Sequence, residues 1–202
     1  MAGFSAMAAA AKSLERLLTR RLLADVPVTT TGTVTKAALV STDDFNLSEK
    51  SSIKKPPVLS IFLVRVEVNH VMRATWSGIG AVDGRAHLPL DLHFLLTPWA
   101  SNAEFEMRIL GSAMRCLEET PVLSGPLLDT THGAGFAPDE AVQIVPGDLG
   151  PDSIMRIWDT LDLDYRLSVP YLLRIVRLDS DPVSSHPPVL EAVAGATPSL
   201  EP

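Results

Sequence analysis

The sequence is poor in cysteine and in positive charge, and both shortages exclude classes of function. Cys116 is the sole cysteine, so the chain has no disulfide framework and no cysteine metal cluster, which suits a reducing cytoplasm. Asp and Glu number 24 against 17 Lys and Arg, giving a formal charge of −7. An acidic chain lacks the basic footprint of a nucleic-acid-binding protein, and we expect no nucleic-acid partner.

Long apolar runs are also missing. A membrane-spanning helix needs roughly 18 consecutive apolar residues, and the closest stretch is interrupted at Arg65 and Glu67. The alanine-rich region 1–23 carries its positive charges after the apolar stretch, whereas a signal peptide carries them before it. We therefore expect a soluble protein without a signal peptide or stable membrane insertion.

Motifs of the common catalytic sites are absent. The chain has no G-x-S-x-G elbow and no H-E-x-x-H pair. Gly78, Gly80 and Gly84 lack the spacing of a G-x-G-x-x-G phosphate loop, and a strand rather than a helix is predicted after them. The sequence thus contains no motif that identifies a nucleophile or a cofactor site, and we expect neither an enzyme nor a cofactor.

The composition is sufficient for one buried hydrophobic core, since 46% of the 202 residues are hydrophobic and 20% are charged. Helical spacing of apolar residues predicts amphipathic helices at 5–24, 102–119 and 152–161. Strands are predicted within 26–40 and at 59–68, 87–99, 141–145 and 168–178. Turn-forming residues predict loops at 41–57 and 123–138.

This order of elements predicts an α+β fold, a mostly antiparallel or mixed sheet flanked by helices. We expect one domain over residues 1–178 and a flexible acidic, Pro-rich tail over 179–202. Pro170 cannot donate into a ladder, so the first half of the last strand is predicted at a sheet edge or at the start of the strand.

The segment His87–Trp99 raises the question of a metal site. A two-residue period places the leucines on one face and His87, Asp91 and His93 on the other. Asp91 and His93 stand close enough to share a zinc ion, but His87 is too far along the strand, and no third ligand is evident. We expect a core face of Leu88, Leu90, Leu92, Phe94 and Leu96 and a polar face that holds no metal. Asp91 is expected to pair with His93 or a neighbouring arginine.

The leucine stripe of the N-terminal helix, which includes Leu14 and Leu18, allows two interpretations. It packs on its own domain or it docks on a partner subunit. Both interpretations stay open from the sequence.

Three segments are informative in combination, namely 88–97, 108–124 and 158–171. In this order they resemble the cap, or tail-terminator, proteins of phage-tail-like contractile injection systems, whose N-terminal domain was formerly one of unknown function. The resemblance covers most of residues 10–180. Residues 41–57, 124–139 and the tail after Asp179 depart from it.

The resemblance implies a tail-terminator-like fold and a homo-hexameric ring. Such a ring sits on the inner tube distal to the baseplate, contacts the last sheath layer and stops polymerisation. It implies a cytoplasmic protein within an assembled particle that can be released. We hypothesise that an edge strand beginning at Ser168 pairs with a sheath or cap neighbour. The candidate interface residues are Ser168, Pro170, Leu172, Arg174, Leu14 and Leu18.

Two other classes of function remain as alternatives. One is a hydrolase or metalloenzyme that uses Asp91 and His93. The other is a monomeric partner-binding module that uses the N-terminal helix.

Overall fold

The computed structural model describes residues 3–28, 34–46, 51–76, 86–128, 136–137 and 140–180. The helices in this part of the chain are α1 (Ala6–Asp25), α2 (His70–Trp76), α3 (Ala103–Glu119) and α4 (Pro151–Thr160). The strands are β1 (Lys36–Val40), β2 (Val58–Val68), β3 (His87–Trp99), β4 (Val122–Ser124), β5 (Ala141–Pro146) and β6 (Val169–Asp179). Short 3-10 turns are η1 (Thr42–Asn46), η2 (Ser52–Lys54) and η4 (Gly125–Leu127).

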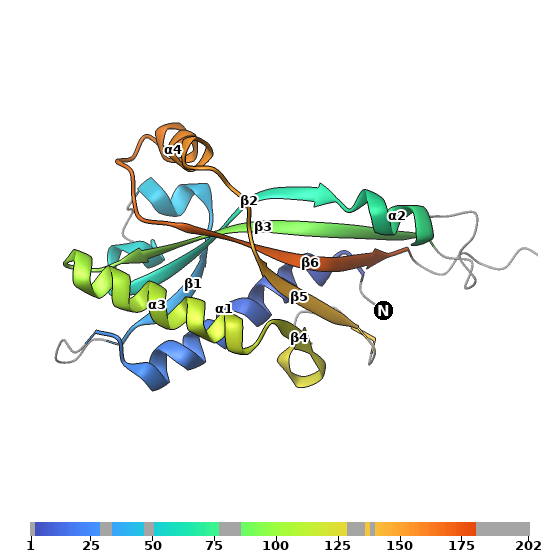
Figure 1. Ribbon diagram of the computed structural model, residues 1–202, viewed down its shortest axis with the longest axis horizontal. Coiled ribbons are helices and arrows are strands. Elements are labelled where there is room, and N and C mark those ends of the chain that lie inside the picture. Colours follow the sequence, from blue (N-terminus) through green and yellow to red (C-terminus); the bar gives the residue numbers. More distant parts are fainter. Residues whose placement is uncertain are drawn as a thin grey trace, which may run out of the picture.

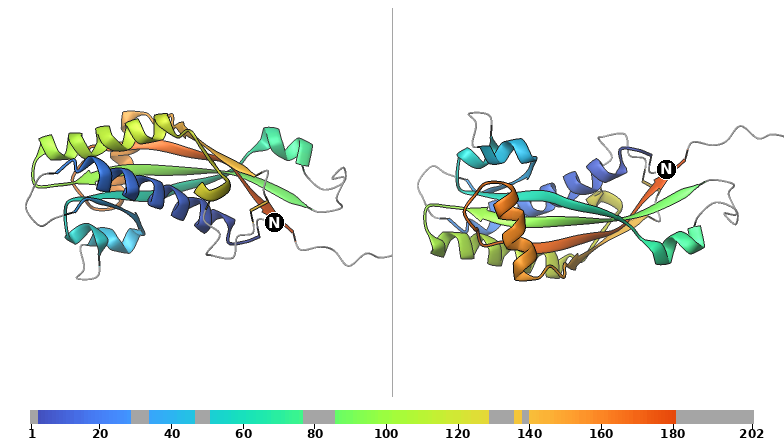
Figure 2. Two further views of the ribbon diagram at one scale, coloured as in Figure 1. Left: turned by 90° about the horizontal axis from the view of Figure 1, so that it is seen from below. Right: turned by 90° about the horizontal axis from the view of Figure 1, so that it is seen from above.

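All six strands form one mixed sheet in the order β1-β2-β3-β6-β5-β4. Strand β1 is parallel to β2, and every other neighbouring pair is antiparallel. Helices α1 and α3 lie against one face of the sheet, here called the first face, and α4 and α2 lie at opposite ends of the second face (Figure 1). The views from below and above show the same division (Figure 2). The predicted α+β class with a mixed sheet is confirmed.

Strand β3 has the register that its period predicts. Leu90, Leu92, Phe94 and Leu96 are buried on the first face within one core that also contains the α1 and α3 stripes. Leu88 is only half-buried and packs at the margin of this core. Helix α3 begins where it was predicted to begin, because Asn102 Oδ1 accepts a hydrogen bond of 2.9 Å from the Phe105 N–H. Met114 on the same helix is 40% exposed and lies outside this core.

A second, smaller core lies under α4 on the second face. Trp158, Trp99 and Phe45 meet there, with ring centroids 5.7 Å apart for Phe45 and Trp158 and 6.2 Å for the two tryptophans. Phe45 and Ile53 belong to η1 and η2 and are buried. The loop predicted at 41–57 therefore contains two ordered turns, whose apolar side chains are core residues.

Several local predictions need correction. Pro151 is the first residue of α4 after Gly150, one residue before the predicted start of this helix. Residues 70–76, for which no element was predicted, form α2, and Gly78, Gly80 and Gly84 lie outside the described residues. The loop predicted at 123–138 contains part of β4 and η4. No helix in the described part of the chain is long and apolar enough to cross a membrane.

Of the two positions predicted for Pro170, the start of the strand is confirmed and the sheet edge is wrong. β6 lies between β3 and β5 and is paired with both. Pro170 is the second residue of β6, and its carbonyl accepts a bond of 2.9 Å from the Gly147 N–H, just beyond the last β5 pair. Because the N and O of one strand residue face the same side, the missing donor of Pro170 faces the end of β5, and no bond to β3 is lost.

Candidate interaction surface

One edge of the sheet is blocked by side chains of α1. The Thr19 hydroxyl accepts from the Ala37 N–H at 3.2 Å and donates to the Ala37 carbonyl at 3.3 Å. Glu15 Oε1 accepts from the Leu39 N–H at 3.0 Å. These are the outward-facing backbone groups of β1, which would otherwise recruit another strand. A further strand cannot be added along β1 without displacing α1.

The same side of the sheet has an open segment further along. β1 pairs with β2 only as far as Phe62, so Leu63–Val68 has no outer partner strand among the described residues; we call this segment the open edge. Leu63 and Val66 are 37% and 42% exposed there. Since the Asn69 N–H bonds the Pro89 carbonyl in β3, the alternation of an antiparallel strand turns the N–H of Val66 outward. The opposite edge, β4, is only three residues long.

Between α4 and α2 the second face carries polar side chains of β2, β3 and β6, here called the polar strip. Its members are Arg65, Glu67, Asp91, His93 and Arg174, and Leu172 lies among them opposite His93. Arg65 Nη2 lies 2.8 Å from Glu67 Oε2, and His93 Nε2 lies 3.2 Å from each of these two atoms. The three side chains form one polar cluster, in which Arg65 and Glu67 are an exposed ion pair and His93 is largely covered.

Asp91 belongs to a different network from His93. Both of its carboxylate oxygens accept from Asn69 Nδ2, at 3.0 and 3.2 Å. Asn69 Oδ1 accepts in turn from the Met72 N–H at 3.0 Å, which joins the strip to the start of α2. The expected partner of Asp91, His93 or an arginine, is therefore wrong: an asparagine serves instead.

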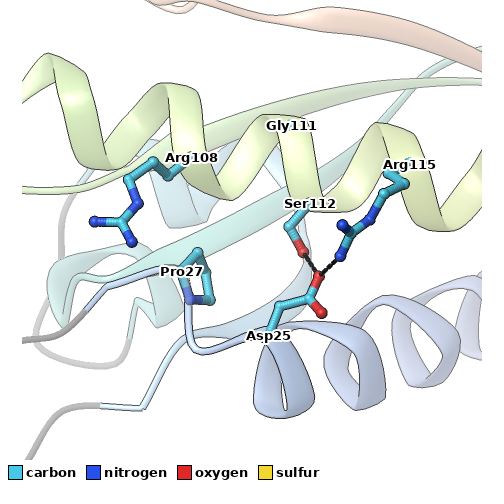
Figure 3. A pocket seen from close by; sticks show the side chains of 6 residues that line it. All are labelled: Asp25, Pro27, Arg108, Gly111, Ser112 and Arg115. Carbon is cyan, nitrogen blue, oxygen red and sulfur yellow. Dashed lines mark hydrogen bonds and ion pairs between the residues drawn. The ribbon is translucent and has the colours of Figure 1, made fainter.

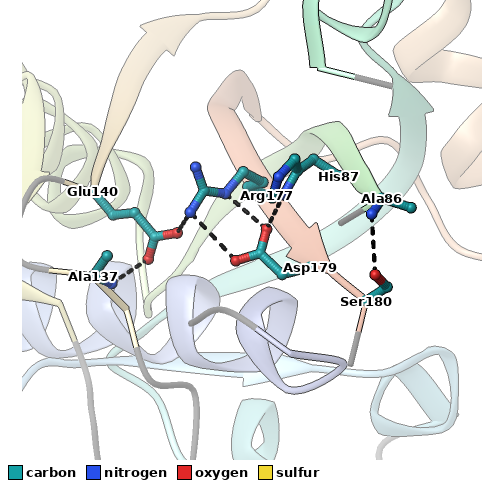
Figure 4. A network of polar contacts seen from close by, with 7 residues as sticks. All are labelled: Ala86, His87, Ala137, Glu140, Arg177, Asp179 and Ser180. Carbon is teal, nitrogen blue, oxygen red and sulfur yellow. Dashed lines mark hydrogen bonds and ion pairs between the residues drawn. The ribbon is translucent and has the colours of Figure 1, made fainter. Parts of the chain in front are cut away.

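The other histidines do not gather around Asp91. His87 Nδ1 lies 2.7 Å from Asp179 Oδ1 at the far end of the sheet (Figure 4). His70 is exposed on α2, and His132 and His186 lie outside the described residues. Within the described part of the chain, no three His, Cys, Asp or Glu side chains are grouped as metal ligands.

A groove lined by both apolar and polar side chains separates α2 from β5 and β6. It consists of two adjoining hollows of about 240 and 410 Å³ that share Trp76, Ala141 and Ile175. Phe136 lines one hollow, and Val71, Met72 and Arg174 line the other. At its rim the Arg177 guanidinium lies 5.8 Å from the Trp76 ring centroid.

Away from the groove, a separate hollow of about 320 Å³ lies between the end of α1 and α3 (Figure 3). Asp25 Oδ2 accepts from the Ser112 hydroxyl at 2.6 Å and from Arg115 Nη2 at 2.8 Å. The Ser112 hydrogen bond first, and then the charges of Arg115 and Arg21, hold the pKa of Asp25 below its usual value. These contacts fasten α1 to α3.

The structure separates the predicted interface residues into two groups. Leu14 and Leu18 are fully buried against the sheet, so α1 packs on its own domain and does not offer these side chains to a partner. Ser168 is buried, and its hydroxyl forms a hydrogen bond of 2.8 Å with Thr97 Oγ1. Pro170 lies on the interior strand β6, two residues before Leu172. Leu172 and Arg174 are half-buried on the polar strip.

Sequence reasoning missed the open edge and the groove. The alternating charges at Arg65 and Glu67 are the sequence signal for an exposed half of β2. No pattern could identify the groove, because α2 is short and none of its residues is buried.

The chain was then compared with known proteins. A family model described as the Pvc16 N-terminal domain matches residues 9–191. No curated protein matches the sequence significantly. A solved structure of an extracellular contractile injection system, the PVC sheath/tube terminator in its extended state, is similar at 17% identity and a TM-score of 0.52. The match covers 93% of this chain and 64% of that one.

A second similar structure is the anti-feeding prophage cap, a tube-terminating cap. It shares 18% identity over 68% of this chain and 48% of that chain, at a TM-score of 0.42. The sheath/tube terminator supports the fold assignment. The chain spans less than two-thirds of the length of either structure.

Proposed function

Because the chain belongs to the Pvc16 N-terminal domain family, we propose that it is a structural cap of a contractile injection system. In this proposal it ends the polymerisation of tube and sheath at the end distal to the baseplate. The similarity of its fold to a sheath/tube terminator supports the assignment. Its partners are the last tube and sheath layers, and its role is non-enzymatic.

The mechanism rests on a difference between the two halves of one sheet edge: the backbone of one half is unpaired, and that of the other is bonded by side chains of α1. A terminator must bind the last layer and yet offer no equivalent surface to the next subunit. The open edge at Leu63–Val68 has an unpaired backbone that can accept a strand. β1, beside it, has its outward groups occupied by Thr19 and Glu15, so pairing does not propagate along the whole edge.

Several copies are needed to close the end of a cylindrical particle. We propose a homo-hexameric ring, in which each subunit presents the same surfaces to the particle. The polar strip beside the open edge contributes Leu172 and Arg174 to the contact with the particle. Assembly takes place in the cytoplasm, and the finished particle is of the extracellular kind.

Electron microscopy of particles from cells with and without this chain tests the capping role. Without the chain, tubes should be overlong or unsheathed, because nothing ends their growth. Particles of normal length and sheathing in the deletion strain would overturn the proposed function.

Val66→Pro tests the open edge separately. Its N–H faces outward, so proline removes a donor to a partner strand while leaving the bonds to β3 in place. We expect Val66→Pro to reproduce the deletion defect and Val66→Thr, which keeps the N–H, to give normal particles. Normal particles with Val66→Pro would reject the edge as the contact while leaving the capping role intact.

A further inference from the structure

The groove between α2 and the sheet has an apolar and aromatic part, beside which Asn69, Glu140 and Gln143 also line it. Trp76 and Phe136 line it, together with Ile175 and Met72. Val71, on the same short helix, is 80% exposed. Aromatic-lined grooves of this kind accept polyproline II segments, whose extended backbone is already ordered before binding.

An arginine that has no ion-pair partner among the described residues lines the groove beside these apolar side chains. Arg174 lines the groove, and Arg73 lies on α2. Neither makes an ion pair with any residue of the described chain, whereas Arg177 at the rim is held by Glu140 and Asp179 at 2.8 Å each (Figure 4). In a chain of net charge −7, an arginine that lines the groove without an ion-pair partner among the described residues favours an acidic ligand.

The described chain ends beside this groove. The Ser180 N–H donates to the Ala86 carbonyl at 2.9 Å, and the Ser180 hydroxyl accepts from the Ala86 N–H at 3.0 Å. Ser180 follows Arg177 by three residues, which is about 10 Å along a strand. The next two residues are Asp181 and Pro182, a dipeptide that favours a change of chain direction.

The sequence beyond this point has the chemistry that the groove requires. Residues 181–202 contain five prolines and three acidic residues, with no Lys or Arg. Within them His186-Pro187-Pro188-Val189-Leu190-Glu191 combines a diproline, two apolar side chains and a carboxylate. We propose that this segment docks in the groove of its own chain, with Pro187 and Pro188 against Trp76 and the Glu191 carboxylate paired with Arg174.

Because the segment and the groove belong to one chain, weak contacts are sufficient to keep the segment docked for much of the time. At about 3.1 Å per residue, the chain from Ser180 to Pro187 spans up to roughly 22 Å, whereas Arg177 lies about 10 Å back along the strand with its guanidinium 5.8 Å from the Trp76 ring centroid. A short tether gives an effective concentration in the millimolar range, so a segment with millimolar intrinsic affinity is already docked about half of the time. Docking covers Trp76 and Val71 and supplies the missing counter-charge to Arg174. This inference does not rest on the capping role, but a docked tail occupies Arg174 and has to leave before that side chain contacts the particle.

Disulfide trapping in the full-length chain tests it. Val71→Cys/Leu190→Cys places one thiol on α2 and one in the segment, and Met155→Cys/Leu190→Cys is the matched control on exposed α4. Native Cys116 is buried and contributes no accessible thiol. Under mild oxidation in dilute solution we expect the first pair to close within one chain about ten-fold faster than the control, given the millimolar local concentration of docked thiols. The measurement is a non-reducing gel over time.

Charge reversal supplies the second arm. Arg174→Glu or Glu191→Lys in the V71C/L190C background should slow closure several-fold, and the two changes together should restore it. Closure rates equal to the control, or disulfides formed only between two chains, would overturn the proposal. A double reversal that fails to restore the rate would overturn the Glu191–Arg174 pairing on which it rests.

Discussion

The block on β1 predicts a specific defect when the Thr19 hydroxyl is removed. Thr19→Val keeps the shape and nearly the helix propensity of the side chain but leaves the N–H and the carbonyl of the buried Ala37 without partners. Each lost bond contributes about 0.5–1.5 kcal/mol. Because both are long, at 3.2 and 3.3 Å, we expect a total loss of about 1–2 kcal/mol in the free energy of unfolding.

Urea titration and thermal unfolding measure this loss, which corresponds to a fall in Tm of about 2–8 °C for a chain of this size. Thr160→Val is the matched control, since the Thr160 hydroxyl is exposed and bonds only the Arg156 carbonyl one turn back in α4; it should cost less than about 0.5 kcal/mol. Light scattering should detect no added self-association, because α1 and the Glu15–Leu39 bond still cover β1. Equal losses of stability in the two variants would refute the assigned role of Thr19.

Two further predictions concern the core and pH. Leu92→Ala leaves a cavity in the first-face core and should lower the free energy of unfolding by about 2–5 kcal/mol; Leu172→Ala on the opposite face should lower it by less than about 1 kcal/mol, and similar losses in urea titrations would contradict the assigned register. The pKa of Asp25 is depressed in the folded chain, so its contribution is complete above its unfolded pKa of 3.8 and is lost as pH falls through the lower native pKa. Asp25→Asn should therefore remove part of the acid destabilisation, measured by urea titration between about pH 6 and pH 3; identical pH profiles for the two proteins would contradict it.

Local patterns predicted β3 and α3 well because packing and propensity agree there. The leucines of β3 repeat at the period of a strand that has one face in a core. Asn102 stands where the first free N–H groups of α3 need an acceptor. Each of these signals lies within the element that it specifies, so no knowledge of the neighbouring strands is required.

The order of strands was beyond such patterns. Pro170 lacks a donor wherever it lies, and only the pairing of β5 determines that this gap faces the end of a neighbour rather than solvent. The partner of Asp91 is set by Asn69, at the end of the adjoining strand. The groove needs α2, β5 and β6 together. A groove formed by three separate segments cannot be identified from the sequence of any one of them.

Strand β3 contributes to both cores of the molecule. Leu92, Phe94 and Leu96 belong to the core under α1 and α3, and Leu95 and Trp99 belong to the core under α4. Neither core can therefore open without disturbing the strand that supports the other, which makes the two behave as one cooperative unit in unfolding. The backbone amides near the middle of β3 will consequently be among the last in the chain to exchange their hydrogens with solvent.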